Sequence, residues 1–181
     1  MKGIVFTEFI ELMETKFGAD LAEQVIMDSN LPSGGAYTSV GTYSHDEIVA
    51  LVITLSQKTG IEISDLIQAF GTHLLKRFSI LFPEFFSEVP VVTDFLSNVD
   101  DYIHGEVLKL YPDATLPDLD TSIKENGDIE LLYKSDRMMG DLAEGLIVGA
   151  IDHFGQTHTY HREDLNQEGG AQCIRFIVTA R

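Results

Sequence analysis

One histidine and three hydrogen-bond donors later in the sequence could together bind a ligand. Tyr133, Ser135 and Arg137 alternate along the chain, so all three leave the same face if the backbone stays extended through the arginine. Their hydroxyls and guanidinium suit a rigid ligand with two carboxylates, because arginine can bind a carboxylate through paired hydrogen bonds. His104 adds an imidazole, which is a common metal ligand.

A helix over residues 95–111 is predicted to position His104. Apolar residues recur at helical spacing on one face, which we expect in the core: Leu96, Val99, Ile103, Val107 and Leu110. His104 falls at the margin of this face, so its imidazole is expected to be partly shielded from water. The same position also suits a core histidine bonded to a local carbonyl, or a histidine at the solvent margin with no special task. We expect Asp100 and Asp101 to be solvated.

The other predicted helices carry apolar faces rich in Phe, Leu and Ile. The periodic segments are residues 4–17, 20–29, 45–58, 65–82 and 139–154. Ser44 and Glu47 form a capping-box pattern, in which the serine accepts from a backbone amide and the glutamate reaches back. Gly71 lies within residues 65–82, where glycine costs about 1 kcal/mol relative to alanine. It fits close helix packing, a hinge, or room for a bulky ligand.

Segments with β character follow in the second half of the chain. Asn126-Gly127 favours a tight turn between residues 119–124 and 129–135, and residues 157–162 and 172–180 are predicted to pair as well. We therefore expect an α+β fold in a single domain over residues 1–181. A helical N-terminal lobe would span about residues 1–64, and a second lobe over about 65–181 would hold helices and a four-stranded antiparallel sheet.

Composition limits the partners and the compartment. The 181 residues carry 29 acidic against 12 basic side chains, and the net charge of −17 argues against binding to nucleic acid or to an anionic membrane. Cys173 is the single cysteine, so an internal disulfide is impossible. The first residues do not resemble a signal peptide, and no apolar run approaches the roughly 20 residues of a membrane span. We expect a cytoplasmic protein.

A partly shielded histidine, donors for two carboxylates and apolar helices together indicate heme binding. The imidazole would ligate the iron and the donors would hold the propionates. The apolar faces would cover the porphyrin, which we expect to be buried between the two lobes.

The sequence also resembles the heme nitric oxide/oxygen-binding (H-NOX) domain family, of the bacterial stand-alone type, over essentially the whole chain. The residues that carry the resemblance are Met1-Lys2-Gly3, His104, Lys109-Leu110-Tyr111-Pro112-Asp113-Ala114, Pro117, Tyr133-x-Ser135-x-Arg137 and Leu142-x-x-Gly145-Leu146. The resemblance implies heme b (protoporphyrin IX iron) as the cofactor, with His104 as the proximal iron ligand. It implies that the Tyr133 motif holds the propionates.

The resemblance assigns roles to further positions. It implies that Pro117 presses on and distorts the porphyrin, and that Gly71 is a helix hinge. It also implies a distal side lined by apolar residues: Val5, Phe9, Leu74, Phe78, Leu142 and Leu146.

The expected ligand is nitric oxide. Family members that hold oxygen stably have a distal tyrosine, whereas Leu142 stands at the matching position here, with Leu74 as its companion. A hydrogen bond to a charged group is worth about 1.5–3 kcal/mol, or roughly a ten- to hundredfold change in affinity, and oxygen needs that donor far more than nitric oxide does. We expect a sensor that binds nitric oxide and carbon monoxide, excludes stable oxygen binding, and signals by releasing His104. The resemblance implies a histidine kinase or a cyclic-di-GMP enzyme as the partner.

Other classes of function remain open at this point. A heme enzyme such as a peroxidase would need polar acid and base groups where Val5, Leu74 and Leu142 are expected. An oxygen carrier would need the missing donor, and a module that binds apolar ligands or proteins would contain no metal. A zinc site at His158, His161 and Cys173 is disfavoured, because residues three apart on a strand point to opposite faces.

Overall fold

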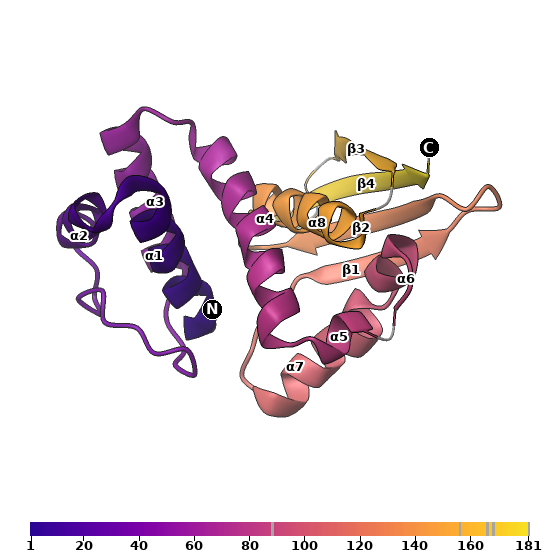
Figure 1. The fold of residues 1–181 in the computed structure, drawn as a ribbon, viewed down its shortest axis with the longest axis horizontal. Coiled ribbons are helices and arrows are strands. Elements are labelled where there is room, and N and C mark those ends of the chain that lie inside the picture. Colours follow the sequence, from indigo (N-terminus) through magenta and orange to yellow (C-terminus); the bar gives the residue numbers. More distant parts are fainter. Residues whose placement is uncertain (88, 156, 166, 168, 181) are drawn as a thin grey trace.

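The fold is described from a computed structural model, which covers residues 1–87, 89–155, 157–165, 167 and 169–180. Helices α1 (Gly3–Phe17), α2 (Ala19–Asp28) and α3 (His45–Thr59) form one group at the N-terminal end. The long helix α4 (Ile63–Leu81) lies between this group and a sheet that carries helix α8 (Gly140–Phe154) on one face (Figure 1). The observed class is α+β, as predicted.

The N-terminal helices begin and end close to the predicted residues. Gly18 ends α1 with a φ of 90°, and Gly60 ends α3 with a φ of 74°, in the left-handed region that glycine adopts without strain. Ser44 caps α3 by accepting from the amide of Asp46 at 3.2 Å. The predicted capping box is only half formed, because the carboxylate of Glu47 faces the interior and accepts hydrogen bonds from Ser33 and Tyr37 instead.

The second half of the described chain forms one antiparallel sheet of four strands in the order β1-β2-β4-β3. The strands are β1 (Asp118–Ile123), β2 (Ile129–Ser135), β3 (His158–Asp164) and β4 (Gln172–Ala180). Gly127, with a φ of 86°, lies in the predicted β1–β2 turn. In the β2–β4 register Leu131 lies opposite Phe176 and Tyr133 opposite Ile174, and all four side chains are buried. Apolar side chains that alternate along β2 and β4 therefore share the buried face of the sheet.

The stretch predicted as one helix, residues 95–111, is helical over most of its length but is not a single regular α-helix. The short helix α5 (Glu84–Ser87) precedes this stretch, which divides into α6 (Val92–Ser97), a π-helix (Val99–His104) and α7 (Gly105–Leu110). The amide of Ile103 donates to the carbonyl of Asn98, five residues earlier, at 3.2 Å. This wider turn interrupts the 3.6-residue repeat, so residues after it no longer lie on the predicted apolar face. Leu110, which was expected in the core, is 68% exposed.

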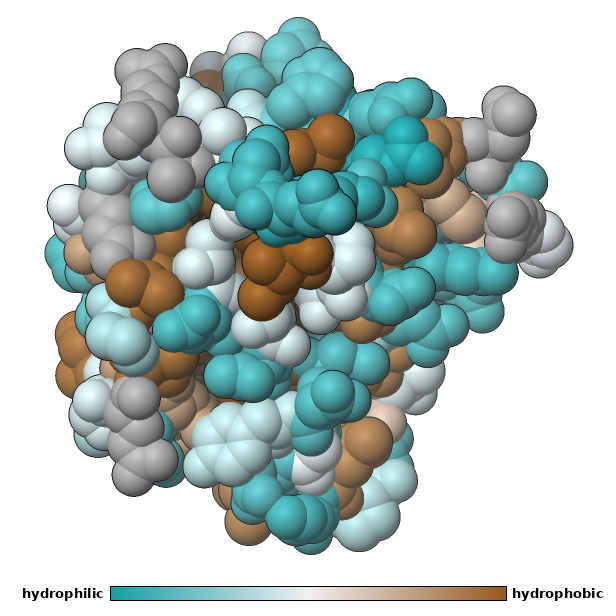
Figure 2. Space-filling model, turned by 90° about the vertical axis from the view of Figure 1, so that its right-hand side faces the viewer, coloured by the Kyte–Doolittle hydropathy of each residue, from teal (hydrophilic) through white to brown (hydrophobic). Residues whose placement is uncertain are grey.

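Polar residues cover most of the end of the molecule that carries the tip of the β1–β2 hairpin, and hydrophobic residues appear between them in separate patches (Figure 2). None of the described helices combines the length and the apolar composition that crossing a bilayer requires.

Candidate functional site

His104 is the last residue of the π-helix, and its side chain is 16% exposed. Its Nδ1 lies 3.0 Å from Oδ1 of Asp100, one turn earlier in the same helix. The Asp100 side chain is 44% exposed, in keeping with the expectation that it is solvated, but its contact with His104 was not predicted. With Nδ1 hydrogen-bonded, the Nε2 lone pair of a neutral imidazole is left for another partner.

The π-helix packs through its apolar residues rather than through His104. Val99 and Ile103 contact a buried cluster that includes Ile129, Leu131 and Tyr133 of β2. Strand β1 lies beside the π-helix and begins at Asp118, so the partly buried Pro117 is at the point where the chain enters the sheet.

The three predicted donors come together, although not along one strand. β2 ends at Ser135, and Arg137 lies in the following turn, so the extended backbone does not continue through the arginine. The turn instead lets the Arg137 amide donate to Ser135 Oγ at 3.2 Å, while Nη1 donates to the carbonyl of Thr115 at 2.9 Å. Tyr133 is 4% exposed, and burial raises its pKa although a hydrogen bond with Ser135 opposes the shift, so its hydroxyl remains a neutral donor.

The apolar residues predicted to line the distal side belong to one hydrophobic cluster. Its buried residues come mainly from helices α1, α2, α3 and α4 and include Phe9 and Leu74, whereas the other predicted residues are partly buried and pack against it: Val5, Phe78, Leu142 and Leu146. Phe78 and Leu146 also pack against the second cluster, which contains Tyr133 and against which Ile103 packs. Phe78 and Leu146 therefore lie where the two clusters meet. The structure therefore brings the donors, the π-helix and the apolar set to adjoining regions.

A polar link between the N-terminal helices and the segment after α7 was not predicted. Nζ of Lys2 lies 3.2 Å from Asp113 Oδ1 and 4.6 Å from the ring centroid of Tyr111. Thr42 donates to Asp113 Oδ2 at 2.9 Å, and this bond together with Lys2 lowers the pKa of Asp113. Lys2, Tyr111 and Asp113 belong to the motifs that carry the family resemblance, whereas Thr42 belongs to none. Only the folded chain brings these residues together.

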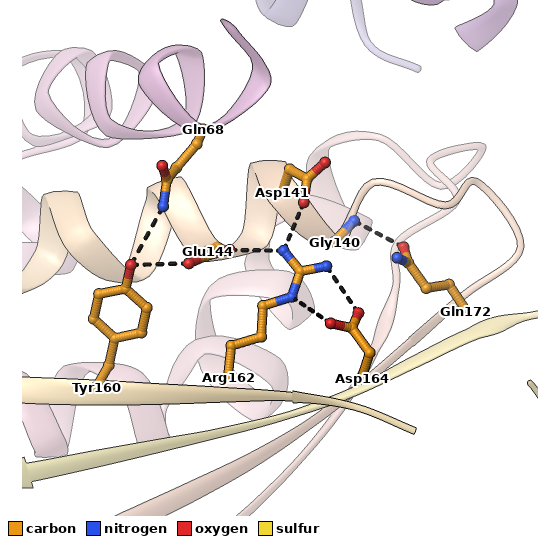
Figure 3. A network of polar contacts seen from close by, with 8 residues as sticks. All are labelled: Gln68, Gly140, Asp141, Glu144, Tyr160, Arg162, Asp164 and Gln172. Atoms are coloured by element: carbon orange, nitrogen blue, oxygen red, sulfur yellow. Dashed lines mark hydrogen bonds and ion pairs between the residues drawn. The ribbon is translucent and has the colours of Figure 1, made fainter. Parts of the chain in front are cut away.

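A second network of polar contacts, which was not predicted from the sequence, links α8 to the sheet (Figure 3). Nη1 of Arg162 on β3 lies 2.6 Å from Asp141 and 2.7 Å from Glu144, both on α8. Tyr160 donates to Glu144 at 2.8 Å and accepts from Gln68 of α4 at 3.3 Å. Burial opposes the charge of Arg162, but its carboxylate partners raise its pKa above the usual value. The network therefore holds the helix that carries Leu142 and Leu146.

The residues present fit heme. A histidine whose Nδ1 is held by a carboxylate is arranged as metal-ligating histidines usually are. Tyr133, Ser135 and Arg137 supply neutral and cationic donors for carboxylates, and the adjoining cluster is apolar. Among the described residues, no three His, Cys, Asp or Glu side chains are arranged to hold a metal ion by themselves. The fold and the site together define an α+β heme-binding domain.

Comparisons with known proteins agree with this class. The family model described as Haem-NO-binding matches residues 2–162. The crystal structure of the unliganded Fe(II) H-NOX protein from K. algicida is 33% identical and superposes with a TM-score of 0.91, covering 100% of this chain and 97% of that one. The H-NOX protein from S. oneidensis in the Fe(II)NO state is 27% identical, with a TM-score of 0.89 and 98% of each chain covered. No curated protein sequence matches the chain.

The chain belongs to the Haem-NO-binding, or H-NOX, family. Its cofactor is heme, at which members of the family bind gases, and it is a sensor domain rather than an enzyme. The roles of the individual residues remain predictions.

Proposed function

We propose that this domain is a nitric oxide sensor that also binds carbon monoxide and does not bind oxygen stably. The observation that supports this proposal is the apolar cluster that contains Leu74 and Leu142. Both positions offer only methyl groups where an oxygen-binding site needs a hydrogen-bond donor. Without such a donor, the oxygen complex loses about 1.5–3 kcal/mol, while nitric oxide loses much less.

Two tyrosines that pack against the same cluster have hydrogen-bond partners for their hydroxyl groups. Tyr37 donates to Glu47 at 2.9 Å, and burial raises its pKa to about 12. Tyr43 OH accepts from the amide of Thr38 at 2.9 Å. Both hydroxyls therefore have partners within the N-terminal lobe: Glu47 for Tyr37 and Thr38 for Tyr43.

For signalling, we propose that His104 would hold the heme iron as its proximal ligand and that release of His104 on nitric oxide binding would be the signal. Heme, when bound, would supply the iron that binds both the imidazole and the gas. Tyr133, Ser135 and Arg137 would hold its propionates, and Pro117 would press on one face. The released π-helix could then shift relative to the N-terminal lobe, with Gly71 as the hinge. A switch of this kind requires that the ligand interact differently with two states.

The contact of Lys2 and Thr42 with Asp113 offers a path for this shift. Asp113 follows α7, which continues directly from His104, while Lys2 and Thr42 belong to the N-terminal lobe. A displacement of the His104 segment would therefore strain these hydrogen bonds. We propose a histidine kinase or a cyclic-di-GMP enzyme in the cytoplasm as the partner that detects the new surface.

Electronic absorption and electron paramagnetic resonance of the ferrous protein test the proposal. We expect a five-coordinate complex with nitric oxide, a six-coordinate complex with carbon monoxide, and no oxygen complex in air. A nitric oxide complex that keeps His104 bound would contradict the proposed signal. A persistent oxygen complex in air would contradict the proposed selectivity and favour an oxygen-binding role.

A further inference from the structure

We propose that Asp100 is a positioning residue that sets the strength of the bond between His104 and the heme iron. The inference rests on the proposed role of His104 as the proximal ligand. It starts from the 3.0 Å contact between Asp100 Oδ1 and His104 Nδ1 within the π-helix. Short π-helical segments occur frequently at functional sites, and this one ends at the ligand itself.

The first consequence of the contact concerns the tautomer. A carboxylate accepts hydrogen bonds, so the imidazole presents an N–H at Nδ1 and keeps its lone pair at Nε2. The ring is also held in orientation, because acceptor and ring lie one turn apart on the same short helix. His104 therefore offers Nε2 to the iron without first reorganising.

The second consequence concerns the strength of the iron–imidazole bond. A carboxylate draws the Nδ1 proton more strongly than a neutral carbonyl does, and this raises the basicity of the ligating nitrogen. A more basic nitrogen binds iron more tightly. Because the signal requires that His104 dissociate, Asp100 acts as the residue that determines how readily the sensor responds.

The surroundings of Asp100 identify a suitable control. Its side chain is 44% exposed and lines a groove between the π-helix and β1. Asp118 lines the same groove but lies on β1. Changing Asp118 to asparagine alters the charge of the groove by the same amount while leaving the Asp100–His104 hydrogen bond in place.

Resonance Raman spectroscopy of the unliganded ferrous protein tests the proposal. We expect the iron–imidazole stretch to move to lower frequency in Asp100→Asn and further in Asp100→Ala, and to stay in place in Asp118→Asn. Asp100→Glu, which restores a carboxylate, should lie closer to the wild type than Asp100→Asn does. Removal of such a second partner typically weakens metal binding about 10- to 100-fold, so His104 should dissociate at least about tenfold faster after nitric oxide is added.

The possible outcomes separate this inference from the proposed function. An unchanged stretch in both Asp100→Asn and Asp100→Ala would overturn the role of Asp100, even if the variants were less stable. An equal shift in Asp118→Asn would also overturn it, because the effect would then come from the general charge of the groove. If the wild-type nitric oxide complex kept His104 while Asp100→Asn still lowered the stretch, the role of Asp100 would stand and the proposed signal would fail.

Discussion

Gly71 of α4 and Gly145 of α8 bring the backbones of their two helices into direct contact. A Cβ atom on Gly71 would lie 2.4 Å from the carbonyl oxygen of Leu142, and one on Gly145 would lie 2.1 Å from that of Gln68. Thr72 adds a hydrogen bond to the carbonyl of Gly145 at 3.1 Å. The contact shows the close packing that was one explanation for Gly71, and its role as a hinge stays a prediction.

The Gly145→Ala substitution is expected to destabilise the fold. Alanine gains up to about 1 kcal/mol in a helix interior, but forcing two backbones apart costs typically about 1–3 kcal/mol or more. Because the clashing atom belongs to the backbone of α4, we expect the cost to dominate and the free energy of unfolding in urea to fall. Gly105→Ala is the control, since a Cβ on Gly105 meets no atom within 4 Å. Equal stability of wild type and Gly145→Ala would contradict this account.

Loss of the propionate donors should weaken heme binding. For Arg137→Met and for Tyr133→Phe we expect each lost hydrogen bond to a carboxylate to cost about 1.5–3 kcal/mol, or roughly a ten- to hundredfold faster transfer of heme to an acceptor protein. Tyr160→Phe removes a hydroxyl that is engaged with Glu144 and Gln68, and should leave the transfer rate unchanged. A Tyr133→Phe protein that kept heme as long as the wild type would show that Tyr133 is not a propionate ligand.

A donor at position 142 should create oxygen binding. Leu142→Tyr places a hydroxyl within the apolar cluster on α8, and one hydrogen bond to bound oxygen would raise its affinity roughly ten- to hundredfold. The ferrous protein in air should then show an oxygen complex by absorption spectroscopy. Leu142→Phe, which adds the ring without the hydroxyl, should not. Oxygen binding in both variants, or in neither, would contradict the role given to the hydroxyl.

The stability of the fold should depend on the protonation of His73. Burial lowers the pKa of His73 from its usual value of 6.5, with nearby Arg77 and Lys16 acting in the same direction and Glu8 and Glu11 opposing it. Near and below pH 6.5 the unfolded chain therefore binds this proton more readily than the folded protein does, so the free energy of unfolding falls as the pH decreases.

Urea unfolding at a series of pH values measures this effect. His73→Gln cannot take up the proton, so its stability should decline less steeply than that of the wild type as the pH falls below 6.5. Parallel curves for the two proteins would show that His73 does not contribute to the acid sensitivity.

The parts of the fold that could be predicted are those with local signals. The β1–β2 hairpin follows from the Asn126-Gly127 turn, and the start of α3 follows from its Ser44 cap. The π-helix could not be predicted, because Asn98 accepts from Ile103 in a wider turn that the spacing of apolar residues does not encode.

Contacts between side chains from distant segments could not be predicted from the sequence either. Glu47 matches a capping box locally, yet in the folded chain its carboxylate meets Ser33 and Tyr37 instead. The candidate site was found because residue types indicated its chemistry and the family resemblance assigned the roles. The contact of Asp100 with His104 could not be predicted, because an aspartate four residues before a histidine is common. Only the side-chain geometry reveals this contact.

The His104→Gly substitution tests the central claim most directly. Glycine removes the imidazole and leaves room for free imidazole to enter, so the absorption spectrum of the ferrous protein should differ from that of the wild type and return to it when imidazole is added. A His104→Gly protein that shows the wild-type spectrum without added imidazole would contradict the claim that His104 binds the iron.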